Sequence, residues 1–238
     1  AAYAANKISE LSNEGVLIVA PSDHLIQDTN AFNNQIFKAY NYAKNNDALV
    51  TLGIKPHRPD TGYGYIQFEP DEISEGINKV KTFTEKPPLE LAEKFLESGD
   101  FLWNSGMFIW SIPTILKALN NFLPELNLSF SEVKGAYNTV LEKKHIDRIY
   151  SSIPSISIDN GILEKAENVY VLPSEFGWSD LGTWKSVHES LQGVDSNTVL
   201  NVNLLAIDAT NNLIVSEKEK LVVIKDLDGY FVVDTDDA

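Results

Sequence analysis

The sequence contains no cysteine and a single methionine, Met107, among its 238 residues. Without cysteine there is no disulfide bond, thiol nucleophile, cysteine-ligated zinc or iron–sulfur cluster. The four histidines form no pair at metal-ligand spacing, which argues against a zinc site, and no G-x-S-x-G elbow marks a serine nucleophile. The sequence therefore carries no signature of covalent catalysis by a side chain.

Positive charge is also scarce. Lys and Arg number 19 against 34 Asp and Glu, which gives a formal net charge of −15 and a pI near 4.6. Such a field repels nucleic acid and anionic lipid, so we expect neither as a partner. No apolar run approaches the roughly 20 residues that cross a bilayer, and no basic-then-apolar leader pattern is present. With the lack of cysteine, this favours a cytoplasmic protein.

The first part of the chain alternates between helical and strand patterns. Residues 1–12 predict a helix, 15–20 a buried strand, 32–40 a second helix and 48–54 a second buried strand. A strand, a helix and a strand with short joints favour a βαβ unit in a parallel sheet covered on both faces. The segments that follow predict a mixed, mainly parallel α/β sheet.

The composition changes near residue 194, where helical patterns end. Short strands are predicted at 204–208, 213–215, 221–224 and 230–233, with turn signals between them. We therefore divide the chain into a core of residues 1–193 and a small β-rich region of residues 194–238.

Two acidic residues lie in turns that suit a metal site. Asp23 follows a buried strand in Ala20-Pro-Ser-Asp-His24, and Asp180 lies between two glycines in Gly177-Trp-Ser-Asp-Leu-Gly182. A carboxylate at the carboxyl end of a strand is placed to bind Mg²⁺ that bridges phosphates. The spacing fits capping equally well, with Asp23 capping the next turn and Ser179 or Asp180 capping a helix.

Three further motifs carry groups suited to a sugar phosphate. Gly64 lies in a loop where two glycines allow close backbone approach to a ligand. Glu85 and Lys86 follow an extended segment and offer a hydroxyl acceptor and a partner for an anion, and Asn104 offers an amide. A glycine-rich turn is the alternative for the Gly64 loop, and a solvated ion pair is the alternative for Glu85 and Lys86. Paired acids would also suit a glycosidase, which nothing else in the sequence favours.

The order of the motifs is more specific than any single motif. It resembles that of the sugar-1-phosphate nucleotidyltransferases, and among them the bacterial mannose-1-phosphate guanylyltransferases, or GDP-mannose pyrophosphorylases. The resemblance covers residues 1–192, and the tail is similar to the β-rich C-terminal region of that family. The motifs are APSDHLI, GIKPHRPDTGYGYI, FTEKP, FLWNSGMFIW, SIDNGILEKA and GWSDLGTW.

The resemblance implies a Rossmann-like core of the nucleotide-diphospho-sugar transferase type. It also implies that GTP and α-D-mannose 1-phosphate react in the presence of Mg²⁺ to give GDP-mannose and pyrophosphate. The sugar phosphate would attack the α-phosphate in line, a reaction that relies on positioning and electrostatics. Family analogy also favours a homodimer.

The resemblance assigns roles to individual residues. Asp23, Asp180 and Lys86 would be the catalytic residues, with Asp23 and Asp180 as the Mg²⁺ ligands and Lys86 on the phosphate. Asn160 would line the sugar side unless its turn is purely structural. The other residues expected to bind substrate are Gly64, Glu85, Asn104 and Asp159.

One family element has no counterpart in the sequence. The glycine-rich N-terminal signature GGxGTRxWPxSxxxPKQ is absent, so we expect the chain to begin beyond the triphosphate-binding segment and the guanine-binding strand. By itself it would then be an incomplete enzyme without its base-reading part. Two alternatives stay open: a non-catalytic paralogue that keeps the sugar-nucleotide pocket, and a nucleotidyltransferase for another hexose 1-phosphate.

Overall fold

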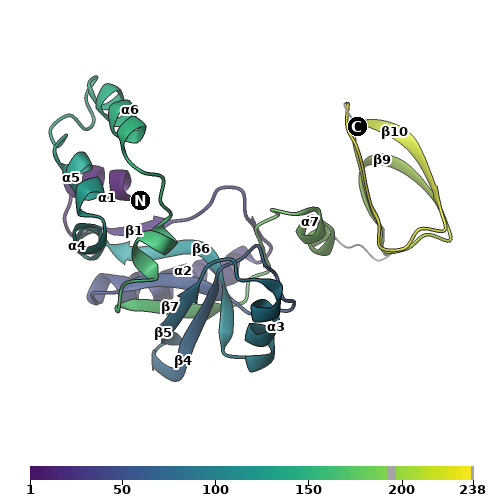
Figure 1. Cartoon of the computed structure of the whole chain (residues 1–238), viewed down its shortest axis with the longest axis horizontal. Coiled ribbons are helices and arrows are strands. Elements are labelled where there is room, and N and C mark those ends of the chain that lie inside the picture. Colours follow the sequence, from purple (N-terminus) through teal and green to yellow (C-terminus); the bar gives the residue numbers. More distant parts are fainter. Residues whose placement is uncertain (192–196, 237–238) are drawn as a thin grey trace. The chain divides into compact units, whose positions relative to one another are not determined.

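The computed structural model describes residues 1–191 and 197–236 (Figure 1). The chain forms two compact units: unit 1 comprises Ala1–Ser22 and Gln27–Phe176, and unit 2 comprises Asp23–Ile26 and Gly177–Ala238. A short segment from the first part of the chain thus belongs to the second unit. The boundary expected between residues 193 and 194 lies outside the described residues. Within the described ranges, no helix combines the length and the apolar composition of a membrane span.

Unit 1 is built around one six-stranded mixed sheet with the order β1-β6-β3-β7-β5-β4. Strands β1, β3, β4 and β7 run in one direction, and β5 and β6 run in the other. Neighbouring β3 and β7 are parallel, whereas the other neighbouring pairs are antiparallel. The expected mixed α/β fold is confirmed, but the expectation of a mainly parallel sheet is wrong, because β3–β7 is the one parallel pair among the described residues of this sheet of unit 1. The strands are β1 (Val16–Val19), β3 (Leu49–Ile54), β4 (Tyr65–Ser74), β5 (Ile77–Thr84), β6 (Phe101–Ser111) and β7 (Val169–Ser174).

The first two strands are arranged differently from a simple βαβ unit. Helix α2 (Thr29–Asn45) connects β1 to β3 as expected, but β6 lies between these strands and is antiparallel to both. The expected parallel neighbours are therefore wrong for this pair. Strand β1 lies at the sheet edge, where Ile18 is 46% exposed, so its expected full burial is also wrong. The apolar pattern identified the strand and not its neighbours.

Local sequence features explain where two of the helices begin and end. Helix α3 (Leu89–Ser98) ends at Gly99, whose φ of 76° is the left-handed conformation that glycine adopts most easily. Helix α4 (Ile112–Phe122) has Pro113 in its first turn, and Ser111 caps it by accepting the Thr114 N–H at 3.3 Å. The remaining helices of unit 1 are α1 (Ala2–Ser9), α5 (Pro124–Ser131), α6 (Glu142–Ser152) and the single π turn η1 (Asp159–Leu163).

Unit 2 contains a second sheet, in which β9 (Thr198–Ile207), β10 (Leu213–Lys225) and β11 (Phe231–Asp234) are parallel in the order β9-β10-β11. The expected strands at 213–215 and 221–224 are both parts of β10, whose register shifts between Val215 and Lys220. The β-rich C-terminal region is confirmed. Unit 2 also contains α7 (Trp184–Leu191) and the short pair of β2 (Leu25–Ile26) with β8 (Trp178–Ser179).

Buried Asn212 holds successive turns of unit 2 together. Its side-chain nitrogen donates to Asn197 Oδ1 at 3.0 Å and to the Leu227 carbonyl at 2.9 Å, and its oxygen accepts the Tyr230 N–H at 2.8 Å. These bonds join the turns before and after β10. The strands that these turns connect run parallel to one another. Tight two-residue turns would instead have produced antiparallel hairpins.

Close packing around Gly53 of β3 leads to a stability prediction. A Cβ at Gly53 would lie 2.6 Å from Leu102 Cδ1 and 2.6 Å from Val171 Cγ2. We expect Gly53→Ala to lower the free energy of unfolding by about 1–3 kcal/mol, because two neighbouring strands must shift to admit the methyl group. Urea denaturation measures this change. In the control Gly15→Ala, the nearest atom is Ile112 Cδ1 at 3.1 Å. This side-chain end can move, so equal losses in the two variants would contradict the prediction.

Candidate functional site

Three neighbouring strands bring the expected substrate-binding residues of unit 1 together. Strand β4 pairs with β5 on one side and with the start of β6 on the other. Gly64 therefore lies between Glu85, which follows β5, and Asn104 of β6. The Gly64 carbonyl accepts the Asn104 N–H at 2.8 Å, and the Tyr63 carbonyl accepts the Lys86 N–H at 3.2 Å. A Cβ at Gly64 would lie 2.5 Å from Glu85 Oε2, so a larger residue here would displace the Glu85 carboxylate.

Asn104 is held in a network that also includes Asp159. Its Nδ2 donates to Asp159 Oδ1 at 3.0 Å, and its Oδ1 accepts from Thr51 Oγ1 at 3.0 Å and from the Gly106 N–H at 3.2 Å. Asp159 is the first residue of the π turn η1. Single turns of π-helix are frequent at functional sites. The structure thus brings Asp159 to the other expected residues from a distant part of the chain.

Asn160, the neighbour of Asp159, has a local structural role. It is exposed, and its side chain bonds to Ser157 Oγ at 3.0 Å and to Glu164 Oε1 at 2.9 Å. These contacts match the structural turn that the sequence left open for this residue.

Burial shifts the pKa of both carboxyl groups in this cluster. It raises the pKa of Glu85, and nearby Asp159 adds to the effect. Burial likewise raises the pKa of Asp159, against the opposing hydrogen bond from Asn104. The Lys86 side chain is 64% exposed, with Nζ 3.7 Å from Glu85 Oε1. The cluster can therefore accept hydrogen bonds from ligand hydroxyl groups through its carboxyl oxygens while the exposed ammonium pairs with an anion.

The expected metal ligands both belong to unit 2. The antiparallel pairing of Leu25 with Ser179 brings Asp23 and Asp180 to the same end of the β2–β8 pair. Both carboxylates act to raise the pKa of His24, although burial of the imidazole outweighs them and lowers that pKa.

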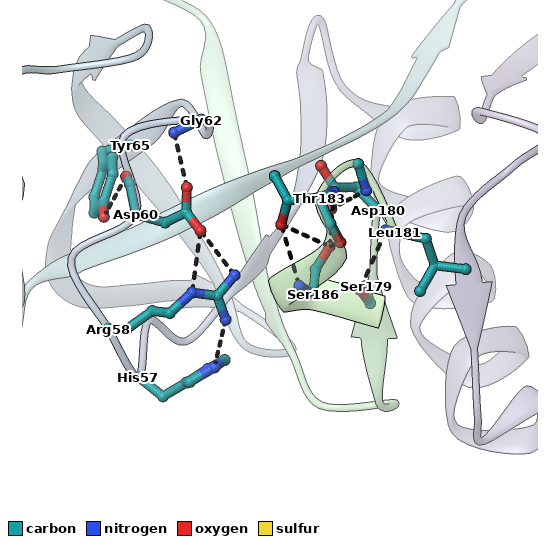
Figure 2. Close-up of polar contacts among 11 residues, drawn as sticks. His57, Arg58, Asp60, Gly62, Tyr65, Ser179, Asp180, Leu181, Thr183 and Ser186 are labelled. Carbon is teal, nitrogen blue, oxygen red and sulfur yellow. Dashed lines mark hydrogen bonds and ion pairs between the residues drawn. The ribbon is translucent and has the colours of Figure 1, made fainter. Parts of the chain in front are cut away.

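Local hydrogen bonds fix the conformation of the Asp180 turn. Asp180 Oδ1 accepts the Gly182 N–H at 3.0 Å. Ser179 Oγ accepts the Leu181 N–H at 3.2 Å (Figure 2). Leu181 has a φ of 52°, an uncommon conformation for a leucine. On the other strand of the pair, Trp178 Nε1 donates to His24 Nδ1 at 3.1 Å.

Residues other than Asp23 and Asp180 cap the two helices that follow them in the chain. Asp28 caps α2 by accepting the N–H groups of Asn30 at 3.0 Å and Ala31 at 2.9 Å. Thr183 Oγ1 accepts the Ser186 N–H at 3.1 Å at the start of α7 (Figure 2). The helix cap of α7 is therefore Thr183 and neither Ser179 nor Asp180.

The chemistry of Asp23 and Asp180 fits a divalent cation. Mg²⁺ is commonly held by one or two protein carboxylates, with water and substrate phosphates completing the shell. Asp23 is exposed and Asp180 is partly exposed, so both carboxylates are accessible to such a shell. In the part of the chain that the structure describes, no group of three or more His, Cys, Asp or Glu is placed to hold a metal by protein ligands alone.

Sequence reasoning missed Thr51, which orients the amide of Asn104. Thr51 is fully buried in β3, and its Oγ1 contacts both Asn104 Oδ1 and the Met107 carbonyl at 3.0 Å. The available signal was a lone hydroxyl in the apolar run of residues 48–54. A buried hydroxyl needs a hydrogen-bond partner, which can be another site residue.

The comparisons with known proteins agree with the motif order. The chain matches the Nucleotidyl transferase family over residues 1–197. It is 34% identical over 226 residues to a mannose-1-phosphate guanylyltransferase of Sinorhizobium fredii (94% of this chain, 44% of the relative). It is 31% identical over 223 residues to one of Escherichia coli (92% and 48%).

A solved structure titled mannose-1-phosphate geranyltransferase from Thermus thermophilus is similar along almost the whole chain. It matches with a TM-score of 0.83 and 27% identity, covering 97% of this chain and 66% of that one. The chain spans about half the length of the curated relatives it matches. The resemblance inferred from the motifs is confirmed at the level of the family.

Burial of Asp159 predicts a pH-dependent change in stability. Because the pKa of this carboxyl is raised in the folded protein, its contribution to stability falls as the pH rises above the ordinary aspartate range. We expect Asp159→Asn to increase the urea midpoint at pH 7, since an amide oxygen can still accept from Asn104. The gain should shrink as the pH is lowered towards the ordinary aspartate pKa.

The control for this variant is Asp147→Asn on α6. Asp147 is exposed and pairs with Lys143 at 2.6 Å, so its replacement removes the same charge without relieving burial. A lower urea midpoint for Asp159→Asn at pH 7 would show that burial of this charge is not the dominant effect.

Proposed function

The chain belongs to the Nucleotidyl transferase family, and we propose that it carries the sugar-phosphate-binding and metal-binding residues of a mannose-1-phosphate guanylyltransferase. The reaction is GTP plus α-D-mannose 1-phosphate giving GDP-mannose and pyrophosphate. The observation that carries the proposal is the convergence of one ammonium, one amide and two carboxyl groups around Gly64. The names of relatives at 31–34% identity support the same substrates.

Mannose is the part of the substrate that the unit 1 cluster fits. Glu85 and Asp159 accept hydrogen bonds from its hydroxyl groups, and the Asn104 amide holds Asp159 Oδ1 in place. Asn104 adds a contact whose direction is set by Thr51. Because Gly64 has no side chain, its backbone can approach the mannose ring closely. Fixed acceptors of this kind favour one arrangement of hydroxyl groups over its epimers.

The phosphate of mannose 1-phosphate pairs with Lys86. Its exposed ammonium lies beside Glu85, so the phosphate and the hydroxyl groups are bound by adjacent residues of one segment. In a chain with a net charge of −15, this local positive group offsets repulsion of the anion. Lys86 would thereby hold the phosphate oxygen in position for its attack on the α-phosphate of GTP, the step that releases pyrophosphate.

Asp23 and Asp180 are the proposed ligands of the divalent cation, which we take to be Mg²⁺. When bound, the ion supplies charge neutralisation on the transferring phosphates. The Gly182 N–H bonds to the Asp180 carboxylate, so this ligand is held in one orientation. GTP as the donor places the reaction in the cytoplasm, and family analogy favours a homodimer.

The direct test is pyrophosphate release from GTP and mannose 1-phosphate with Mg²⁺. It is run on this chain and on the native gene product that contains it, with glucose 1-phosphate and other nucleoside triphosphates as competitors. We expect release with the native gene product, with a preference for mannose 1-phosphate. Release with another sugar or base would identify a different nucleotidyltransferase. Binding of GDP-mannose without any release would identify a non-catalytic paralogue.

Removal of one metal ligand should abolish turnover. In the native gene product we expect Asp180→Asn to reduce pyrophosphate release by at least about 10³-fold, because the amide retains the shape but not the charge of a metal ligand. Isothermal titration of mannose 1-phosphate should be unchanged, since its proposed ligands lie in unit 1.

The control for this variant is Asp71→Asn, which removes an exposed carboxylate from β4. It should keep wild-type turnover. Turnover by Asp180→Asn equal to that of this control would refute the metal-binding role.

A further inference from the structure

The loop of residues 55–64, which connects β3 to β4, is organised by an ion pair that the proposed roles do not use. Arg58 donates to Asp60 Oδ2 from both Nε, at 3.0 Å, and Nη2, at 2.7 Å. Asp60 Oδ1 accepts the Gly62 N–H at 2.8 Å, and the Asp60 carbonyl accepts from the Tyr65 hydroxyl at 2.9 Å. Figure 2 shows these contacts converging on the single carboxylate and its backbone. Asp60 thus forms hydrogen bonds to residues both before and after it in the loop.

The ion pair is shielded by aromatic rings. The Arg58 guanidinium carbon lies 5.2 Å from the centroid of Trp103 and 5.9 Å from that of Tyr63, and Nη1 lies 2.8 Å from His57 Nε2. The Arg58 and Asp60 side chains are only 12% and 18% exposed. The Arg58 guanidinium is planar, donates two hydrogen bonds to one carboxylate and lies near aromatic rings. A lysine side chain cannot reproduce these contacts. The contacts therefore constrain the shape of the loop as well as its charge.

This loop connects directly to the proposed sugar-phosphate site. The Tyr63 carbonyl accepts the Lys86 N–H, and the Gly64 carbonyl accepts the Asn104 N–H. Lys86 has a φ of 46°, in the left-handed region that a lysine rarely adopts. Such a conformation persists only where the surroundings enforce it. The bond to Tyr63 is one of those restraints, and its direction depends on the path of the 55–64 loop.

We propose that Arg58 and Asp60 are positioning residues for the sugar-phosphate site. Their ion pair fixes the 55–64 loop so that its last two carbonyl groups hold the backbone of Lys86 and Asn104 in the binding geometry. The inference rests on the proposed function for its substrate and on the contacts above for its geometry. Arg58 acts on the site through the loop and not by contact with the substrate. Its side chain is largely buried, and its donors already contact Asp60 and His57.

The first experiment measures the geometry without substrate. Amide hydrogen exchange is followed in the wild type, Arg58→Lys and Asp60→Asn, the second variant keeping an acceptor for the Gly62 N–H. We expect exchange at the Lys86 and Asn104 amides to accelerate by about tenfold or more, with the amides of buried β3 unchanged. Unaltered exchange at Lys86 and Asn104 in both variants would overturn the proposal whether or not the protein is an enzyme.

The second experiment measures the consequence for the substrate in the native gene product. Small misplacements of positioned groups cost up to about 10²-fold, so we expect KM and Kd for mannose 1-phosphate to rise about 10-fold or more in both variants. The KM for GTP should stay within about twofold, since the loop holds the sugar-phosphate residues. An equal rise for both substrates would indicate general damage and would overturn the proposal.

A matched control tests whether the loss of an exposed ion pair elsewhere in the protein has the same effect on exchange and KM. Glu90→Gln breaks the pair with Lys94 on α3, which has a similar length of 2.8 Å but side chains that are 82% and 64% exposed. It should leave exchange and both KM values unchanged. Absence of pyrophosphate release in the wild type would count against the proposed function, whereas the exchange experiment would still decide the positioning role.

Discussion

The pairing of β6 along both of its edges is the constraint on which the candidate site depends. One edge pairs with β3 from Trp103 to Trp110. The opposite edge pairs with β4 at residues 101–103 and with β1 at residues 108–111. Along that edge, Asn104 lies between the residues of β6 that pair with β4 and those that pair with β1. Its N–H bonds to the Gly64 carbonyl just before β4 begins, and its side chain reaches η1. A break in pairing beside a central strand is where α/β sheets commonly bind ligands.

The charge distribution is consistent with an acidic protein that binds a phosphorylated sugar. Burial raises the pKa of Glu85 and Asp159, so the carboxyl groups of the cluster are held in an environment that disfavours full charge. Lys86 is exposed beside them and provides a positive group for an anion. The unit 2 carboxylates Asp23 and Asp180 are more open to water. The two sets of acids therefore differ in environment, which suits hydroxyl recognition in one and cation binding in the other.

Local signals were accurate where a single residue type controls the backbone. Gly99 after α3 and Pro113 at the start of α4 lie where their conformational preferences favour a helix end and a helix start, because these preferences act within one turn. Capping was predicted less well. Several acids and hydroxyl residues compete near each helix start, and the structure assigns these roles to Asp28 and Thr183. The path of the entering chain decides which side chain reaches the free N–H groups.

The sequence by itself determined the family, the mixed α/β class and the residues expected at the site, because motif order, apolar periodicity and turn residues are local properties. Only the tertiary structure decided that β6 separates β1 from β3, that Thr51 orients Asn104 and that Arg58 holds the loop beside Lys86. These relations join residues far apart in the chain. They depend on strand order and register, which side-chain patterns leave open because a buried apolar strand can pair with several neighbours.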